Sequence, residues 1–125
     1  MGKVSIVKIN NKNIKESLIK SLELIGGIGS FINHADKVLL KPNFNGTEGT
    51  TNPALAESLI QLLFDSEIRD ISIGESSFGS HQITENFFNK TGFTELAKKY
   101  SINLINFNKS EGVEIDVRNP LILKK

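Results

Sequence analysis

Short runs of apolar, often β-branched residues alternate along this chain with longer stretches whose apolar residues recur at helical spacing. The runs with the composition of strands are Val4–Ile9, Lys37–Lys41, Asp70–Glu75 and Ile102–Phe107. The run Lys37–Lys41 is apolar on both faces, as expected for a central strand that helices cover. Strands that alternate with helices normally pair in parallel through right-handed crossovers. The order therefore predicts an α/β fold, a three-layer, Rossmann-like sandwich with a mainly parallel sheet.

Capping residues indicate where the helices begin. Asn13 precedes one amphipathic stretch, and Asn52 precedes a second one that has Pro53 in its first turn. The buried face of this second helix is expected to consist of Leu55, Leu59, Leu62 and Leu63. A third helical stretch covers about residues 84–100, and we expect an interruption at Gly92.

The end of the chain predicts further strands at an edge of the sheet. Apolar residues alternate strictly with charged ones in the order Val113, Glu114, Ile115, Asp116, Val117 and Arg118. This period of two is typical of a half-exposed strand. Leu121–Leu123 predicts one more short strand, and we expect these last strands to pair antiparallel.

Length and composition limit the class of protein. The chain has 125 residues, so we expect residues 1–125 to form a single α/β domain. Its 15 Lys and Arg balance 14 Asp and Glu, and a net charge of +1 argues against a nucleic-acid or membrane partner. The chain contains no cysteine, so it holds no iron–sulfur cluster, and we predict no cofactor in this chain. No apolar run approaches the roughly 20 residues of a membrane span, and we expect a cytoplasmic protein.

Two polar loops follow predicted strands, and α/β proteins bind ligands where such loops leave the carboxyl edge of the sheet. One loop runs from Lys41 to Asn52, and the other begins at Glu75. The first also enters the amino end of a helix, whose backbone N–H groups and dipole attract anions. We therefore expect an anionic small molecule to be bound by Lys41, Asn43, Thr50, Thr51, Glu75, Ser76 and Ser77.

The same residues also have structural interpretations. Residues 50–52, Thr-Thr-Asn, form a good helix cap without any ligand, and Lys41 could be a surface lysine. Glu75 could act as a general base or metal ligand with His81 nearby, or it could pair with Lys41 across the crevice. One Glu and one His are weak evidence for a metal, so we predict no metal site. The sequence assigns no catalytic residue.

Three stretches of the chain have the pattern of a known family. They are Lys37–Phe44, Thr50–Leu55 and Ile71–Ser76. In this order and at this separation they resemble the family catalogued as domain of unknown function 362. The resemblance extends over nearly the whole chain, and it implies no firmly assigned activity.

Members of that family are often at least twice as long, and some carry a ferredoxin-like domain with two four-iron clusters. This sequence departs from that pattern, because it has 125 residues and no cysteine. The resemblance therefore implies that the chain corresponds to the amino-terminal half of such a protein.

Two functions remain open at this point, and the sequence leaves open whether the chain is an enzyme. The first is to contribute half of a crevice for an anionic small molecule. The second is a non-catalytic interaction module, which would form a homo-oligomer or pair with a missing second half of the protein. The exposed edge strand Val113–Val117 would carry this pairing, since unpaired strand edges readily join another chain.

Overall fold

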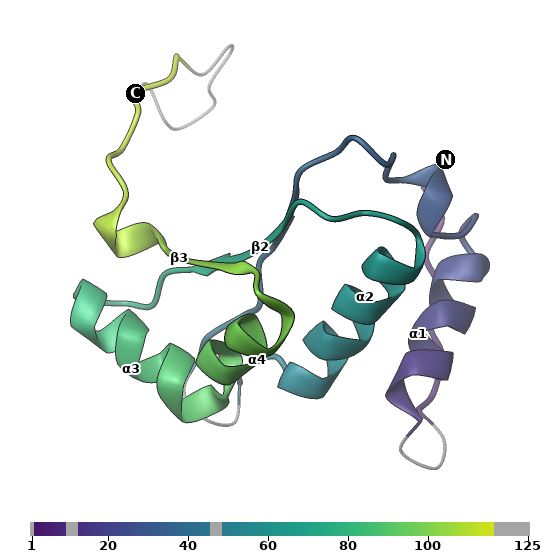
Figure 1. Ribbon diagram of the computed structural model, residues 1–125, viewed down its shortest axis with the longest axis horizontal. Helices are drawn as coiled ribbons and strands as arrows, with labels where there is room; N and C mark the ends of the chain where they lie inside the picture. Colours follow the sequence, from purple (N-terminus) through teal and green to yellow (C-terminus); the bar gives the residue numbers. More distant parts are fainter. Residues whose placement is uncertain (1, 10–12, 46–48, 117–125) are drawn as a thin grey trace.

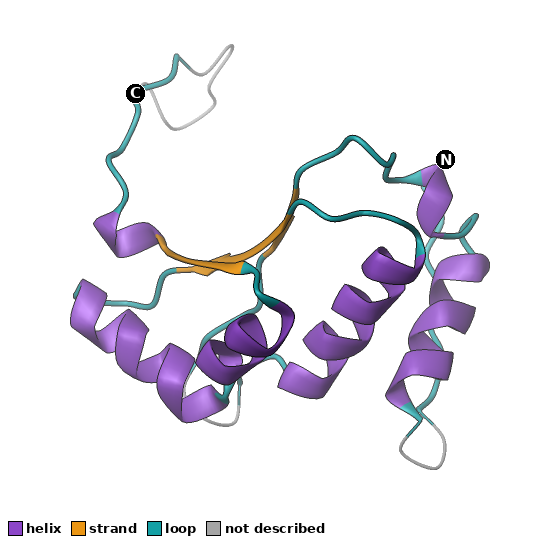
Figure 2. Ribbon diagram, viewed as in Figure 1, coloured by secondary structure: helices purple, strands orange, loops and turns teal. Residues whose placement is uncertain are grey.

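The computed structural model describes residues 2–9, 13–45 and 49–116. Its sheet consists of β1 (Val38–Leu40), β2 (Ile71–Glu75) and β3 (Asn103–Asn106). All pairs are parallel, in the order β1-β2-β3 (Figure 2). The register aligns Leu40 with Ile73, and Ile73 with Leu104. The predicted α/β fold with a parallel sheet is confirmed.

The helices of the described part of the chain gather on one side of this sheet. They are α1 (Ile14–Glu23), α2 (Pro53–Asp65), α3 (His81–Thr91) and α4 (Phe93–Tyr100). Two short 3₁₀ turns, η1 (Ile28–Ser30) and η2 (Phe107–Lys109), follow α1 and β3 in the chain. Figure 1 shows α2, α3 and α4 beneath the sheet, and α1 packs on the outer side of α2. The described residues thus supply the sheet and one helical layer of the sandwich.

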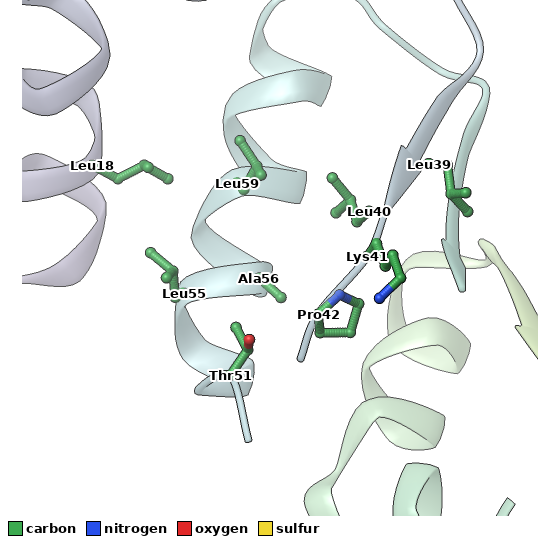
Figure 3. A pocket seen from close by; sticks show the side chains of 9 residues that line it. All are labelled: Leu18, Leu39, Leu40, Lys41, Pro42, Thr51, Leu55, Ala56 and Leu59. Atoms are coloured by element: carbon green, nitrogen blue, oxygen red, sulfur yellow. The ribbon is translucent and has the colours of Figure 1, made fainter. Parts of the chain in front are cut away.

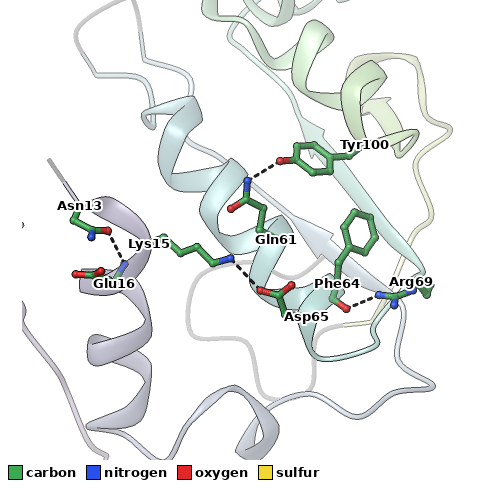
Figure 4. Close-up of polar contacts among 8 residues, drawn as sticks. All are labelled: Asn13, Lys15, Glu16, Gln61, Phe64, Asp65, Arg69 and Tyr100. Carbon is green, nitrogen blue, oxygen red and sulfur yellow. Dashed lines mark hydrogen bonds and ion pairs between the residues drawn. The ribbon is translucent and has the colours of Figure 1, made fainter.

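The predicted helix boundaries agree with the structure where a cap was identified. Asn13 Oδ1 accepts a hydrogen bond from the backbone N–H of Glu16 at 3.2 Å (Figure 4), and Asn52 Oδ1 accepts one from Ala54 at 2.9 Å. Gly92 separates α3 from α4 with a φ of 87°, a left-handed conformation that glycine adopts without a steric penalty. The interruption expected at Gly92 is therefore confirmed.

The core lies between β2 and the helices. Ile73 is fully buried and shares one apolar cluster with Ile60, Phe93 and Leu96. The buried residues of α2 are Ala56, Ser58, Ile60 and Leu63. The prediction of a buried face made of four leucines was therefore wrong, except at Leu63. Because α1 packs on another side of α2, leucines of α2 also face α1, and Leu55 and Leu59 line a groove with Leu18 of α1 (Figure 3).

Two predicted strands do not form in the described residues. The segment Val4–Ile9 has no strand partner, and it runs beside α1, where Ser5 Oγ lies 2.7 Å from Ser21 Oγ. Residues 113–116 also form no strand, because they extend into solvent with Val113 and Ile115 exposed. A strand requires a neighbouring backbone to satisfy its hydrogen bonds. Val117 and the predicted strand Leu121–Leu123 lie outside the described residues.

Polar side chains fix the helices against one another (Figure 4). Lys15 Nζ of α1 lies 3.0 Å from Asp65 Oδ2 of α2, and Gln61 Nε2 of α2 donates to Tyr100 Oη of α4 at 2.8 Å. These contacts hold α2 in the middle of the helical layer. The position of α2 matters for the site, because its amino end leads back to the loop that follows β1.

Glu57 of α2 adds a charged contact to α4. Its Oε1 accepts hydrogen bonds from Lys99 Nζ at 2.6 Å and from Tyr100 Oη at 2.9 Å. The Lys99 hydrogen bond, followed by that of Tyr100, lowers the pKa of Glu57 below 4.5. The hydrogen bond and charge of Glu57 raise the pKa of Lys99 above 10.5. The pair therefore stabilises the fold fully between these two values, and this contribution is lost in stronger acid or base.

We expect Glu57→Gln to lower the free energy of unfolding at pH 6 and to have less effect at pH 3. At pH 3 the carboxyl of the unmodified chain is largely protonated in the unfolded state, and its pairing no longer favours folding in full. Urea unfolding at both pH values measures the two differences. Lys99→Met removes the other member of the pair. Alone or together with Glu57→Gln, it should lower the free energy of unfolding, relative to the unmodified chain, with the same pH dependence as Glu57→Gln. Equal effects of Glu57→Gln at pH 6 and pH 3 would contradict this assignment.

Candidate functional site

The two predicted loops leave the sheet at the same edge. Because β1 and β2 are parallel and Leu40 pairs with Ile73, the chain leaves both strands side by side. Lys41 follows β1 and Glu75 ends β2, and Lys41 Nζ lies 2.6 Å from Glu75 Oε2. The ion pair with Lys41, one of the two alternatives for Glu75, is therefore present. We call this edge of the sheet, with the loops of residues 41–52 and 76–80, the rim.

Glu75 is an unusual component of the rim because its carboxylate is buried. Its side chain is 6% exposed, whereas that of Lys41 is 60% exposed. Oε2 accepts no hydrogen bond of good geometry in the described part of the structure, although the ammonium of Lys41 is close. The short N–O distance shows that the charges are paired, and this single partner leaves acceptor capacity on the carboxylate. Removing a carboxylate from water costs several kcal/mol, so buried carboxylates normally accept several hydrogen bonds.

The first loop is closed by its own polar groups. The backbone N–H of Asn43 donates to Thr51 Oγ1 at 2.8 Å, and the N–H of Thr51 donates to Asn43 O at 2.9 Å. Asn43 Nδ2 donates to Gly49 O at 2.7 Å. Asn52, the next residue, caps α2. The helix-cap interpretation of the Thr-Thr-Asn sequence is thus confirmed for Asn52, whereas Thr51 pairs with the backbone of Asn43 and shapes the loop.

The second loop is held from behind by a buried network. The backbone N–H of Ser77 donates to Thr84 Oγ1 at 3.0 Å, and Thr84 Oγ1 donates to Asn108 Oδ1 at 2.7 Å. Thr84 is fully buried, and Ser77 Oγ lies 3.0 Å from the same hydroxyl. Because the single hydroxyl proton of Thr84 goes to Asn108, Ser77 Oγ is the donor in that contact. Ser77 is therefore a positioning residue, whereas Ser76 is exposed on the rim.

A hollow of about 360 Å³ lies between the two loops. It is lined by Asn43, Phe44, Asn45, Glu75, Ser76, Ser77 and Phe78. Phe44 is buried and packs against Phe88 and Phe93 with ring centroids 5.0 and 5.4 Å apart, so it forms the floor without closing the hollow. Phe78 is fully exposed. Of the seven predicted site residues, four line this hollow, and Lys41 joins them through its ion pair.

Thr50 and Thr51 line a different hollow, of about 320 Å³, at the amino end of α2. Its other lining residues are Asn52, Pro53, Lys90 and Thr91. The seven predicted residues therefore belong to two neighbouring places. The second place includes the carboxyl end of α3, which no local sequence pattern connects with the loop.

An apolar groove, which we call the β1 groove, lies between α1, α2 and β1 (Figure 3). Its volume is about 270 Å³, and its walls are Leu18, Leu39, Leu40, Lys41, Pro42, Thr51, Leu55, Ala56 and Leu59. Lys41 thus stands between the polar hollow and the β1 groove.

The part of the chain that the structure describes lacks two further features. None of its helices has the length and apolar composition needed to cross a bilayer. Within the same residues, no three His, Cys, Asp or Glu side chains come together in a way that could hold a metal ion.

Comparison with known proteins agrees with the motifs at the rim. The family model described as domain of unknown function (DUF362) matches residues 38–125. The chain is similar to a thylakoid-associated protein of Synechocystis sp., with 30% identity over 116 residues, covering 87% of this chain and 35% of that protein. It thus spans about a third of the length of this curated relative. No solved structure matches the chain. Since the family model covers well over half of the sequence, including β1, α2, β2 and both rim loops, the chain belongs to the DUF362 family.

Proposed function

We propose that the rim forms one wall of a crevice that binds a small molecule with an anionic group. Lys41 supplies a largely exposed positive charge, and the exposed Ser76 offers a hydroxyl beside it. Asn43 and Glu75 line the same hollow. Polar groups that converge on a concave surface are characteristic of ligand sites, and the carboxyl edge of a parallel sheet is their usual place.

The buried carboxylate of Glu75 is the observation that carries this proposal. A carboxylate with one ion pair and unused acceptor capacity has not recovered all the hydrogen bonds that water would provide. A ligand hydroxyl or amine would restore them, while Lys41 would face the anionic group of the same ligand. The expected ligand therefore combines an anion with a hydrogen-bond donor.

This wall is open, and we propose that the remaining walls come from the part of the protein that corresponds to the rest of the longer relative. The chain corresponds to 35% of that relative. The rim would bind the anionic group by itself, while an enclosed crevice, and any reaction in it, would be a property of the longer protein.

Binding is tested by thermal unfolding of the chain with inorganic phosphate, nucleotides, hydroxy acids and amino acids. A ligand present at one hundred times its dissociation constant stabilises the folded state by about 2.7 kcal/mol. For a domain of this size, that corresponds to roughly 10 °C in the melting temperature. Lys41→Gln and Ser76→Ala should each reduce the shift, and each variant is compared with its own ligand-free value because Lys41→Gln leaves Glu75 unpaired.

Lys37→Gln is the matched control for Lys41→Gln. Lys37 precedes β1, and its Nζ lies 3.9 Å from Asp70 Oδ2 at the opposite edge of the same two strands. It should leave the ligand-induced shift unchanged. The proposal fails if no compound shifts the melting temperature, or if Lys37→Gln and Lys41→Gln reduce the shift equally.

The exposed end of the described chain favours a second candidate function, as an interaction module. Val113 and Ile115 are exposed large apolar residues on an alternating segment, and burying such side chains against another chain is favourable by about 1.5–3 kcal/mol each. In this function the segment would become a strand only when it pairs with another chain.

Light scattering over a range of protein concentrations tests this second function. Ile115→Gln should abolish any dimer, whereas Glu114→Gln, on the opposite face of the alternating segment, should leave it intact. A monomer at all concentrations, or equal effects of the two substitutions, would count against it.

A further inference from the structure

Among the strands of the described residues, β1 lies at a free edge of the sheet. The N–H of Val38 donates to Asp70 O at 2.8 Å, so Val38 and, two residues later, Leu40 direct their backbone groups toward β2. In a parallel pair the intervening residue directs its N–H and C=O the other way. The backbone groups of Leu39 and Lys41 therefore face away from β2, on the side of the β1 groove.

The β1 groove beside this edge is apolar. Leu18 of α1 and Leu55 and Leu59 of α2 form its outer walls, and Leu39 is 49% exposed (Figure 3). Exposed apolar surface next to unpaired backbone groups is what an additional strand would cover.

The segment Val4–Ile9 has the sequence of such a strand and lies close to this region. Ser5 contacts Ser21, which is three residues beyond Leu18 on α1 and therefore its neighbour on the helix surface. Exposure alternates along the segment, because Val4 and Ile6 are exposed while Ser5 and Val7 are half-buried. This alternation is that of a strand with one face toward the helices.

The direction of the segment also fits. It contacts the third turn of α1 and then reaches the start of the same helix, so it runs antiparallel to α1. Figure 1 shows α1 and α2 rising from the same end of the molecule. Since α2 connects the parallel strands β1 and β2, the segment runs in the direction of β1. A segment followed by α1 and β1 is then an ordinary parallel crossover unit, like β1, α2 and β2.

We propose that Val4–Ile9 of the same chain docks on the free edge of β1 as a fourth parallel strand and closes the β1 groove. Ser5 and Val7 would keep facing the helices, as Val38 and Leu40 do, and Val4 and Ile6 would join Leu39 on the other face. Docking would bring Ile9 to the edge of the sheet that holds Lys41, so the binding wall at the rim would gain a third strand end.

Hydrogen exchange of the full chain, followed by NMR, tests the proposal without any ligand. In the docked state the amides of Leu39 and Lys41 donate to the segment, and we expect them to exchange at least tenfold more slowly than in a variant that lacks residues 2–9. The amide of Leu40, which faces β2, is the internal control and should exchange equally in both. Equal rates for Leu39 and Lys41 in the two proteins would overturn the proposal.

A cross-link provides a second measurement that does not depend on the truncated variant. The chain has no cysteine, so introduced pairs are free of competing thiols. Val4→Cys or Ile6→Cys, combined with Leu39→Cys, should form a disulfide within one chain, because these side chains share a face when the strand is docked. Val7→Cys with Leu39→Cys is the matched control and should not. A disulfide found only between two chains, or none in either test pair, would also overturn the proposal.

Discussion

The arrangement depends on the burial of β2 between two parallel neighbours and the helical layer. Ile71 and Ile73 direct their side chains into the two apolar clusters, and both are almost inaccessible to solvent. A shift of the register by one residue would turn these side chains to the opposite face. The register is therefore well determined, and with it the position of Glu75 beside the end of β1. The rim is a consequence of core packing.

The burial of the Glu75 side chain follows from the same alternation along β2. Glu75 stands two residues after Ile73, so its side chain points toward the helical layer, as do those of Ile71 and Ile73. A carboxylate at a position that the sheet buries needs a compensating charge, and Lys41 on the neighbouring strand end provides it. An apolar residue at this position would pack without that cost. The charge at this buried strand end therefore does not improve the packing of the core, which agrees with the binding role proposed for the rim.

Local patterns predicted the parts of the fold that are decided by nearby residues. Asn13, Asn52 and Gly92 mark helix ends through hydrogen bonds or a backbone conformation within a few positions. The pairing of Lys41 with Glu75 was one of two alternatives for Glu75, because both residues lie where predicted parallel strands end. The network of Ser77, Thr84 and Asn108 was missed, because its members come from a loop, a helix and a turn that only the tertiary structure brings together. The buried face of α2 was predicted wrongly for the same reason. The helical spacing of its leucines does not show which side of the helix the sheet covers and which side α1 covers.

The described residues place no α-helix on one face of the sheet (Figure 1), and part of that face is apolar. Gly74 of β2 has no side chain there, and a β-carbon at Gly74 would lie 2.6 Å from the ring of Phe107 and 3.0 Å from Leu39 Cδ1. Leu39 and Phe107 therefore both approach the glycine and form an apolar patch beside Ser72 and Asn103, which share the face. A solvent-facing side of a sheet normally carries polar residues, so this patch is the part of the face that a covering element would bury. This patch, the edge at β1 and the rim lie on one sheet, so the segment proposed to dock at the β1 edge would border both the patch and the candidate site.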